Sequence, residues 1–129
     1  MAHPDEEVVR RGYEAFSEGD METLRQVFAD DIVWHVPGRS SLAGDYEGVD
    51  AALGYFGQTM ELTGGNFSVS LHDVVAGDDH VVGLHTARAE REGRRLEDNQ
   101  VLVFHLNEGR VASVWQHFGD TYANDEFWG

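Results

Sequence analysis

The second half of the chain consists of four apolar-rich stretches separated by very short turns, and this pattern restricts the possible folds more than any other feature. In residues 66–76, apolar side chains alternate with polar ones, and the stretches 80–90, 96–106 and 110–118 follow after the turns GDD, REG and NEG. Alternation with a period of two between glycine-containing turns is typical of antiparallel strands. We therefore expect four consecutive antiparallel strands.

The first half shows helical spacing instead. Its expected elements are a helix over 5–18 with Asp5 as a possible cap, a second helix over 21–28 capped by Asp20, a short strand over 29–36, a loop over 37–48, and a third helix from Val49 that ends at Gly64-Gly65. Because helices and strands are segregated along the chain, the sequence predicts an α+β fold of order α-α-β-α-β-β-β-β. A curved antiparallel sheet would wrap around the N-terminal helices.

Composition limits the class of protein and its partners. The 129 residues fit one domain, 1–129, and no apolar run reaches the length of a membrane span. The 24 acidic residues outnumber the nine arginines, no lysine is present, and the net charge is −15, which argues against nucleic acid and anionic membranes as partners. No secretory signal is visible and cysteine is absent, so we expect a cytoplasmic protein without disulfides.

The turns REG and NEG suggest a strand register, and the register suggests a site. If both turns are three-residue hairpin loops with glycine in the left-handed position, His85 lies opposite Asn99, which lies opposite His117. One step along, a parallel row contains Gly83, Val101 and Trp115. On this prediction both rows line a pocket floor beside the small residues of the strand 80–90.

A competing interpretation stays open at this stage. A two-residue turn or a single bulge would move a whole strand to the other face of the sheet. The histidines would then be ordinary surface or core side chains.

The stretches YEAFSEGDMETLRQVFADDIVWHVPG, AGDYEGVDAALGYF and FHLNEGRVASVWQHFGD resemble the nuclear transport factor two-like superfamily, in its SnoaL-like, ketosteroid isomerase-related branch. The resemblance covers nearly the whole chain. It implies a cone-shaped α+β barrel with a hydrophobic cavity, and a homodimer that forms through the outer face of the sheet. Members include isomerases, cyclases, hydrolases and proteins without known catalysis, so the fold does not decide the activity.

The steroid isomerases in this superfamily use a carboxylate base, a tyrosine and a protonated acid. By alignment these roles fall on Val36, Gly12 and Val101, none of which can transfer a proton. Tyr13 is displaced by one residue, which rotates it by about 100° on a helix. The isomerase mechanism is therefore disfavoured. The resemblance also directs Trp34 and Val36 toward the cavity, and His35 away from it.

Other chemistries find little support in the sequence. No metal-binding motif occurs, and His72 and His80 are interpreted as part of a solvated loop. We expect no cofactor and no metal. Two hypotheses remain for a pocket that binds a small hydrophobic molecule, with Tyr13 among its lining residues. In the first, His85 or His117 performs acid–base chemistry on a carbonyl compound, assisted by Asn99. In the second, the chain is a non-catalytic binding or dimerisation module.

Overall fold

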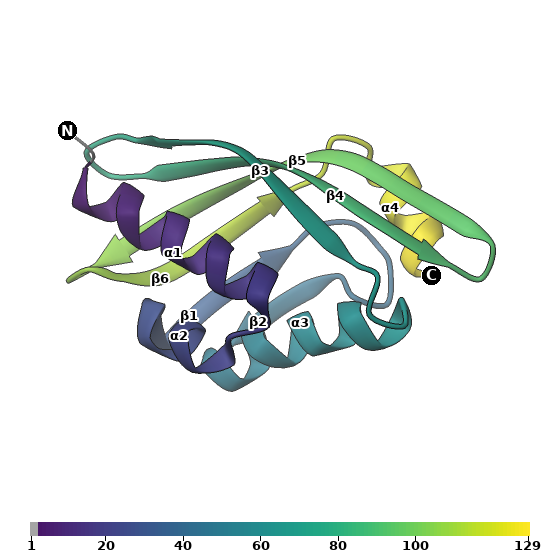
Figure 1. Ribbon diagram of the computed structural model, residues 1–129, viewed down its shortest axis with the longest axis horizontal. Coiled ribbons are helices and arrows are strands. Elements are labelled where there is room, and N and C mark those ends of the chain that lie inside the picture. The colour runs from purple at the N-terminus through teal and green to yellow at the C-terminus, as the bar shows by residue number, and fades with distance from the viewer. Residues whose placement is uncertain (1–2) are drawn as a thin grey trace.

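The computed structural model describes residues 3–129 and contains four helices and six strands (Figure 1). In chain order the elements are α1 (Pro4–Glu18), α2 (Met21–Val27), β1 (Phe28–Val36), β2 (Gly44–Glu47), α3 (Val49–Leu62), β3 (Ser68–Ala76), β4 (Val81–Arg91), β5 (Arg94–Asn107), β6 (Arg110–His117) and α4 (Thr121–Trp128). The predicted α+β fold, with helices before strands, is confirmed. The prediction missed two elements, the short strand β2 and the C-terminal helix α4.

The helix starts show which capping predictions hold. Asp20 caps α2, because its carboxylate accepts a hydrogen bond from the backbone N–H of Thr23 at 3.0 Å. The predicted cap at Asp5 is wrong, because the helix begins one residue earlier, at Pro4. Nδ1 of His3 accepts from the N–H of Asp5 at 3.1 Å, so the imidazole satisfies a donor at the start of α1.

The six strands form one curved sheet in the order β2-β1-β6-β5-β4-β3, with β2 and β3 at its edges. The expected antiparallel pairing holds for β3 to β6, and β2 also pairs antiparallel with β1. The pairing of β1 with β6 is parallel, so the sheet is mixed rather than purely antiparallel. No hairpin joins β1 to β6; α3 and four strands separate them in the sequence, which leaves room for a parallel pairing.

The turns differ from the predicted three-residue loops, and this difference shifts the strand register. Arg91 pairs with Arg94, so the β4–β5 turn contains only Glu92 and Gly93, with φ of 51° and 76°. The β5–β6 turn likewise contains only Glu108 and Gly109, both with positive φ. Positive φ at both central positions is characteristic of a type I′ hairpin. This turn type was hard to predict from the sequence, because glutamate seldom adopts positive φ.

The four helices pack on one face of the sheet and enclose the core, and α2 adds the buried side chains of Leu24 and Val27. Figure 1 shows α1 crossing the sheet, α3 along its β1–β2 side, and α4 at the far end of the β4–β5 hairpin. Within residues 3–129, the helices are all too short or too polar to span a bilayer. The face of the sheet toward α1 and α3 is called the inner face below, and the opposite face the outer face.

Candidate functional site

A small cavity lies between α1, α3 and the inner face of the sheet. Its volume is about 70 Å³, and eight aromatic side chains form much of its wall: Tyr13, Phe16, Phe28, Trp34, Tyr55, Phe56, Phe67 and Phe104. The rings pack edge to face, as Trp34 and Phe56 do at 4.9 Å between centroids and 88° between planes. An apolar cavity of about 150 Å³ accepts benzene. The space in this cavity is therefore about half of what benzene needs.

Two polar side chains meet within this apolar wall. The hydroxyl of Tyr13, from α1, lies 2.8 Å from Nδ1 of His85, from β4. Gly83 lies two residues before His85 on the same face of β4, and it leaves the space that the phenol ring occupies. A Cβ at position 83 would overlap the Tyr13 hydroxyl and lie 2.8 Å from Cε2. The missing side chain of Gly83 is thus what allows Tyr13 to reach the imidazole.

Two glutamines extend the polar group across β5 and β6. Oε1 of Gln100 lies 3.1 Å from Nε2 of His85 and accepts from Nε2 of Gln116 at 3.3 Å. Oε1 of Gln116 in turn accepts from the Trp34 indole at 3.0 Å and from the Tyr55 hydroxyl at 3.1 Å. Apart from Thr59, whose hydroxyl donates to the backbone carbonyl of Phe56, the polar side chains of the cavity wall therefore hydrogen-bond one another and form a connected network among aromatic rings.

The network ends at a buried carboxylate on β5. Asp98 is 6% exposed and accepts four hydrogen bonds: from Nε2 of Gln100 at 3.3 Å, from the backbone N–H groups of Gly119 at 3.1 Å and Asp120 at 3.0 Å, and from Nδ2 of Asn124 at 2.8 Å. A buried carboxylate without such donors is costly. Three of the four donors belong to the start of α4, so the carboxylate connects that helix to the cavity.

Burial moves the pKa values of the two central groups in opposite directions. The pKa of His85 falls below 6.5, chiefly because burial disfavours the imidazolium, and the His72 charge lowers it further. The hydrogen bond to Gln100 and the Asp98 charge oppose this shift in the His85 pKa only in part. Burial also raises the pKa of Tyr13. At neutral pH the site therefore contains a neutral imidazole beside a protonated phenol.

The predicted row of His85, Asn99 and His117 is not formed. Because both turns have two residues, His85 pairs with Gln100 and not with Asn99. A bulge at His105 and Leu106 shifts β6 as well, so His117 pairs with Val101. Asn99 and His117 are exposed on the outer face, whereas His85 is 4% exposed and faces inward.

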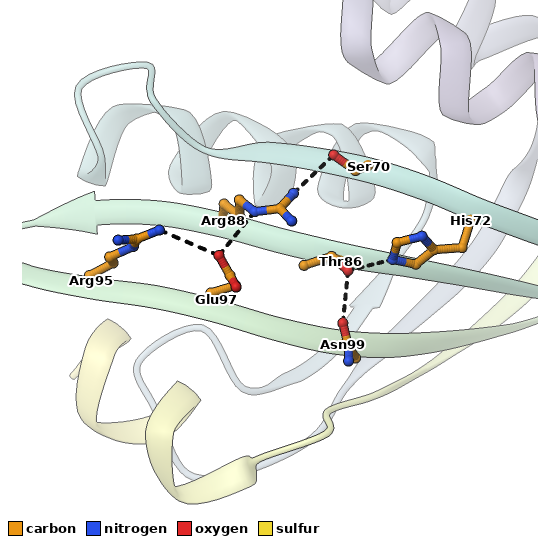
Figure 2. Close-up of polar contacts among 7 residues, drawn as sticks. All are labelled: Ser70, His72, Thr86, Arg88, Arg95, Glu97 and Asn99. Atoms are coloured by element: carbon orange, nitrogen blue, oxygen red, sulfur yellow. Dashed lines mark hydrogen bonds and ion pairs between the residues drawn. The ribbon is translucent and has the colours of Figure 1, made fainter.

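The same shift moves the second predicted row. Val101 and Trp115 lie on the outer face, where Trp115 is 48% exposed, whereas Gly83 faces inward against Tyr13. Figure 2 shows where Asn99 points: its amide oxygen accepts from the Thr86 hydroxyl at 2.8 Å. The same hydroxyl contacts the imidazole of His72. The pocket-lining predictions for Val101 and Trp115 are therefore wrong for this register.

The structure separates the neighbouring residues of β1 as expected. Trp34 forms part of the cavity wall, whereas Val36, which we also predicted to line the pocket, is buried in the core at 6% exposure and does not line the cavity. His35 points to the outer face, where its ring stacks on Trp115 with 3.6 Å between centroids. Its Nδ1 lies 2.7 Å from a carboxylate oxygen of Asp45. The imidazole next to Trp34 therefore has no access to the cavity.

The spacing of the histidine and carboxylate side chains bears on metal binding. Across residues 3–129, no three His, Cys, Asp or Glu side chains come together in a way that could hold an ion. His72 and His80, which we predicted to share a solvated loop, lie apart: His72 contacts Thr86, and His80 packs edge to face on His105. Both side chains are exposed.

Sequence reasoning missed five members of the network: Tyr55, Asp98, Gln100, Gln116 and Asn124. Asp98, Gln100 and Gln116 each directly precede or follow a residue that we had placed on the inner face. The alternative two-residue turn after β4 could have found Asp98 and Gln100, because it puts Gln100 opposite His85. Gln116 faces inward through the bulge at His105 and Leu106. Tyr13 also reaches the cavity although it is displaced by one residue from the isomerase tyrosine.

Comparisons with known proteins agree with this architecture. The SnoaL-like domain family matches residues 9–114. An uncharacterised protein of Mycobacterium tuberculosis is 34% identical over 96% of this chain and 95% of its own length. The structure of Bal32a, from a soil-derived mobile gene cassette, is 46% identical with a TM-score of 0.95, covering 98% of this chain and 97% of that one. IdmH of Streptomyces antibioticus, described as a proposed polyketide cyclase, is 25% identical with a TM-score of 0.75, covering 90% and 92%.

Proposed function

The chain belongs to the SnoaL-like domain family, and from this premise we propose that it binds a small, largely apolar carbonyl compound in the cavity and transfers a proton on it. The observation that carries the proposal is the 2.8 Å contact between the Tyr13 hydroxyl and Nδ1 of His85 within an aromatic wall. A buried acid–base pair beside an apolar space is the arrangement that such chemistry needs.

The two groups suit different roles in one reaction. At neutral pH the His85 imidazole is uncharged and can accept a proton, since its pKa is lowered. Tyr13 keeps its proton, since its pKa is raised, and serves as a hydrogen-bond donor. In the proposed reaction the Tyr13 hydroxyl turns to the carbonyl oxygen, and Nδ1 of His85 removes a proton from the adjacent carbon. The resulting enolate oxygen is stabilised by the phenol, and the imidazolium then returns the proton.

The cavity must enlarge before it can hold such a ligand. The space of about 70 Å³ is well below the roughly 300 Å³ of a small ligand site. Phe16, Phe67 and Val69 are only partly buried and lie where α1 meets β3. We propose that a ligand enters there by displacing these side chains. The similarity to IdmH supports carbonyl chemistry as the class of reaction.

Deuterium uptake tests the proposal directly. The protein would be incubated with small aryl ketones, such as tetralones, in deuterated buffer, and exchange at the carbon next to the carbonyl followed by NMR. We expect exchange above the buffer rate, and a loss of about 10²–10⁴-fold in His85→Gln. His117→Gln is the matched control, because His117 is exposed on the outer face. Equal exchange in wild type and His85→Gln would remove His85 from the chemistry.

A non-catalytic binding module is the second candidate. It is favoured by the observation that the polar groups of the cavity wall already bond to one another, which leaves few free for a ligand. Native mass spectrometry of the purified protein separates the two candidates. A bound molecule that is retained unchanged, with affinity unaffected by His85→Gln, supports this second function.

We also propose a homodimer through the outer face of the sheet. The exposed Trp115 lies there beside the partly buried Val101, Val103 and Val82. Such an apolar row on an open sheet face suits a second sheet of the same kind. The net charge of −15 supports the expectation that nucleic acid and anionic membranes are not partners. Cell fractionation tests the cytoplasmic location expected from the sequence.

A further inference from the structure

Hydrogen bonds connect α4 to Tyr13 through Asp98, Gln100 and His85. Beginning at Asp98, they determine which group donates and which accepts in each bond. Oδ1 of Asp98 accepts from the N–H of Asp120, and Oδ2 accepts from Gly119, Asn124 and Gln100. An ionised carboxylate has only acceptors. Every group that faces it must therefore donate.

Glycine at position 119 supports this clamp. A Cβ there would overlap the carbonyl oxygen of Asn99 and lie 2.7 Å from Oδ1 of Asp98. Only a residue without a side chain lets the backbone lie this close to β5 and present its N–H to the carboxylate. The start of α4 and Asp98 therefore form one fitted contact.

Asp98 and Asn124 together orient the amide of Gln100. The Asn124 amide donates from Nδ2 to Asp98 and to the carbonyl of Asp120, both at 2.8 Å, so its Oδ1 is left as an acceptor. Gln100 Nε2 lies 3.3 Å from this Oδ1 and 3.3 Å from Oδ2 of Asp98. With two acceptors on that side, the amide NH₂ must face them, and Oε1 must face His85.

The oriented amide determines which nitrogen of His85 carries the proton. Since Oε1 of Gln100 only accepts, Nε2 of His85 must donate to it. In the neutral imidazole Nδ1 is then unprotonated, and it accepts a hydrogen bond from the Tyr13 hydroxyl. The opposite tautomer would place two lone pairs against each other at 3.1 Å.

We propose that Asp98 is a positioning residue that, together with docked α4, holds His85 in the neutral Nε2–H tautomer and so keeps Nδ1 available as the base. This inference rests on the proposed function for its chemical meaning, because a base at Nδ1 matters only if the site moves protons. The tautomer itself is a property of the free protein. The C-terminal helix thereby controls the cavity through two intervening side chains, although α4 contributes no residue to the cavity wall.

Nitrogen NMR of the histidine side chains tests the proposal. Long-range proton–nitrogen spectra of ¹⁵N-labelled protein are recorded well above pH 6.5, and His85→Gln identifies the His85 resonances. A bare ring nitrogen resonates far downfield of a protonated one, so the two tautomers are distinct. Wild type should show bare Nδ1 and protonated Nε2 only. A protonated Nδ1 in wild type would overturn the proposal.

Two variants separate positioning from general stability. Asp98→Ala removes one of the two acceptors that orient Gln100 and frees the Asn124 amide that supplies the other, and we expect both tautomers of His85. Arg91→Ala also loosens α4, because it removes the hydrogen bonds from Nη1 to the carbonyls of Phe127 and Trp128, but it leaves both acceptors facing Gln100, and we expect the wild-type tautomer. An unchanged tautomer in Asp98→Ala, or an equal change in both variants, contradicts a positioning role.

Gln100→Leu provides the test if Asp98→Ala does not fold. It leaves the three contacts of Asp98 with the start of α4 intact and removes only the oriented amide, so both tautomers should appear. A retained single Nε2–H tautomer would overturn the proposal. Deuterium exchange separates failure of the proposed function from failure of the role of Asp98. If His85→Gln loses turnover but the His85 tautomer does not depend on Asp98, the proposed function holds and only the role of Asp98 is removed.

Discussion

Replacing Gly83 by alanine should disrupt the site although it replaces none of the polar side chains. The added Cβ would lie 2.8 Å from Cε2 and 3.0 Å from Cζ of Tyr13, so the phenol must move. Forcing one carbon into a packed site costs about 1–3 kcal/mol, and a lost hydrogen bond to His85 costs about 1 kcal/mol. Reduced freedom of the unfolded chain returns about 0.4–1 kcal/mol. We expect a net destabilisation of about 2 kcal/mol.

Urea unfolding measures this change, and a double-mutant cycle assigns its cause. At an m-value of about 2 kcal/mol/M, the midpoint should fall by about 1 M at unchanged m. In a Tyr13→Ala background the collision is gone, so Gly83→Ala should there be neutral or slightly stabilising. An equal loss of stability in both backgrounds would show that Tyr13 does not occupy the space at Gly83.

Three further predictions concern other parts of the molecule. Because folding lowers the pKa of His85, the contribution of this residue to the free energy of unfolding is complete above pH 6.5 and is lost as the pH falls from 6.5 through the folded pKa. In urea unfolding at several pH values, His85→Gln should therefore lose less stability with falling pH than the wild type does. Parallel curves of stability against pH would contradict this. Trp115→Glu should convert a dimer to a monomer in analytical ultracentrifugation, with the monomer still folded by circular dichroism; a wild-type monomer would refute the interface. Gly54→Ala in α3, where a Cβ meets nothing within 4 Å, should raise stability by about 0.5–1 kcal/mol in urea, and a loss would contradict the open space.

The sequence predicted the element types well because hydrophobic periodicity is a local signal. The helices α1, α2 and α3 and the strands β1 and β3 to β6 were all expected near their observed ranges. The short strand β2 pairs only with β1 and lies in a stretch rich in glycine and serine, so tertiary pairing decides its state. The helix α4 has eight residues and is held by Asp98, Arg91 and Arg94 rather than by its own propensity.

The parallel pairing of β1 with β6 also lies outside what periodicity can predict. The two strands are separated by most of the chain, and alternation gives the same pattern in either direction. The prediction of Trp34 on the inner face and His35 on the outer face survived because alternation within one strand does not depend on its partner.

The faces of the site residues depended on two finer features, the number of residues in the β4–β5 turn and a bulge in the pairing of β5 with β6. One residue more in the turn, or one bulge, reverses the face of the strand that follows. The two-residue turn at Glu92 and Gly93 places Asp98 and Gln100 inside, where Gln100 meets His85. A three-residue turn would instead place Asn99 there and expose the carboxylate that holds α4. In the observed register Asp98 accepts from the backbone N–H groups of Gly119 and Asp120, so its contact with the start of α4 stabilises this register and, with it, the position of Gln100 beside His85.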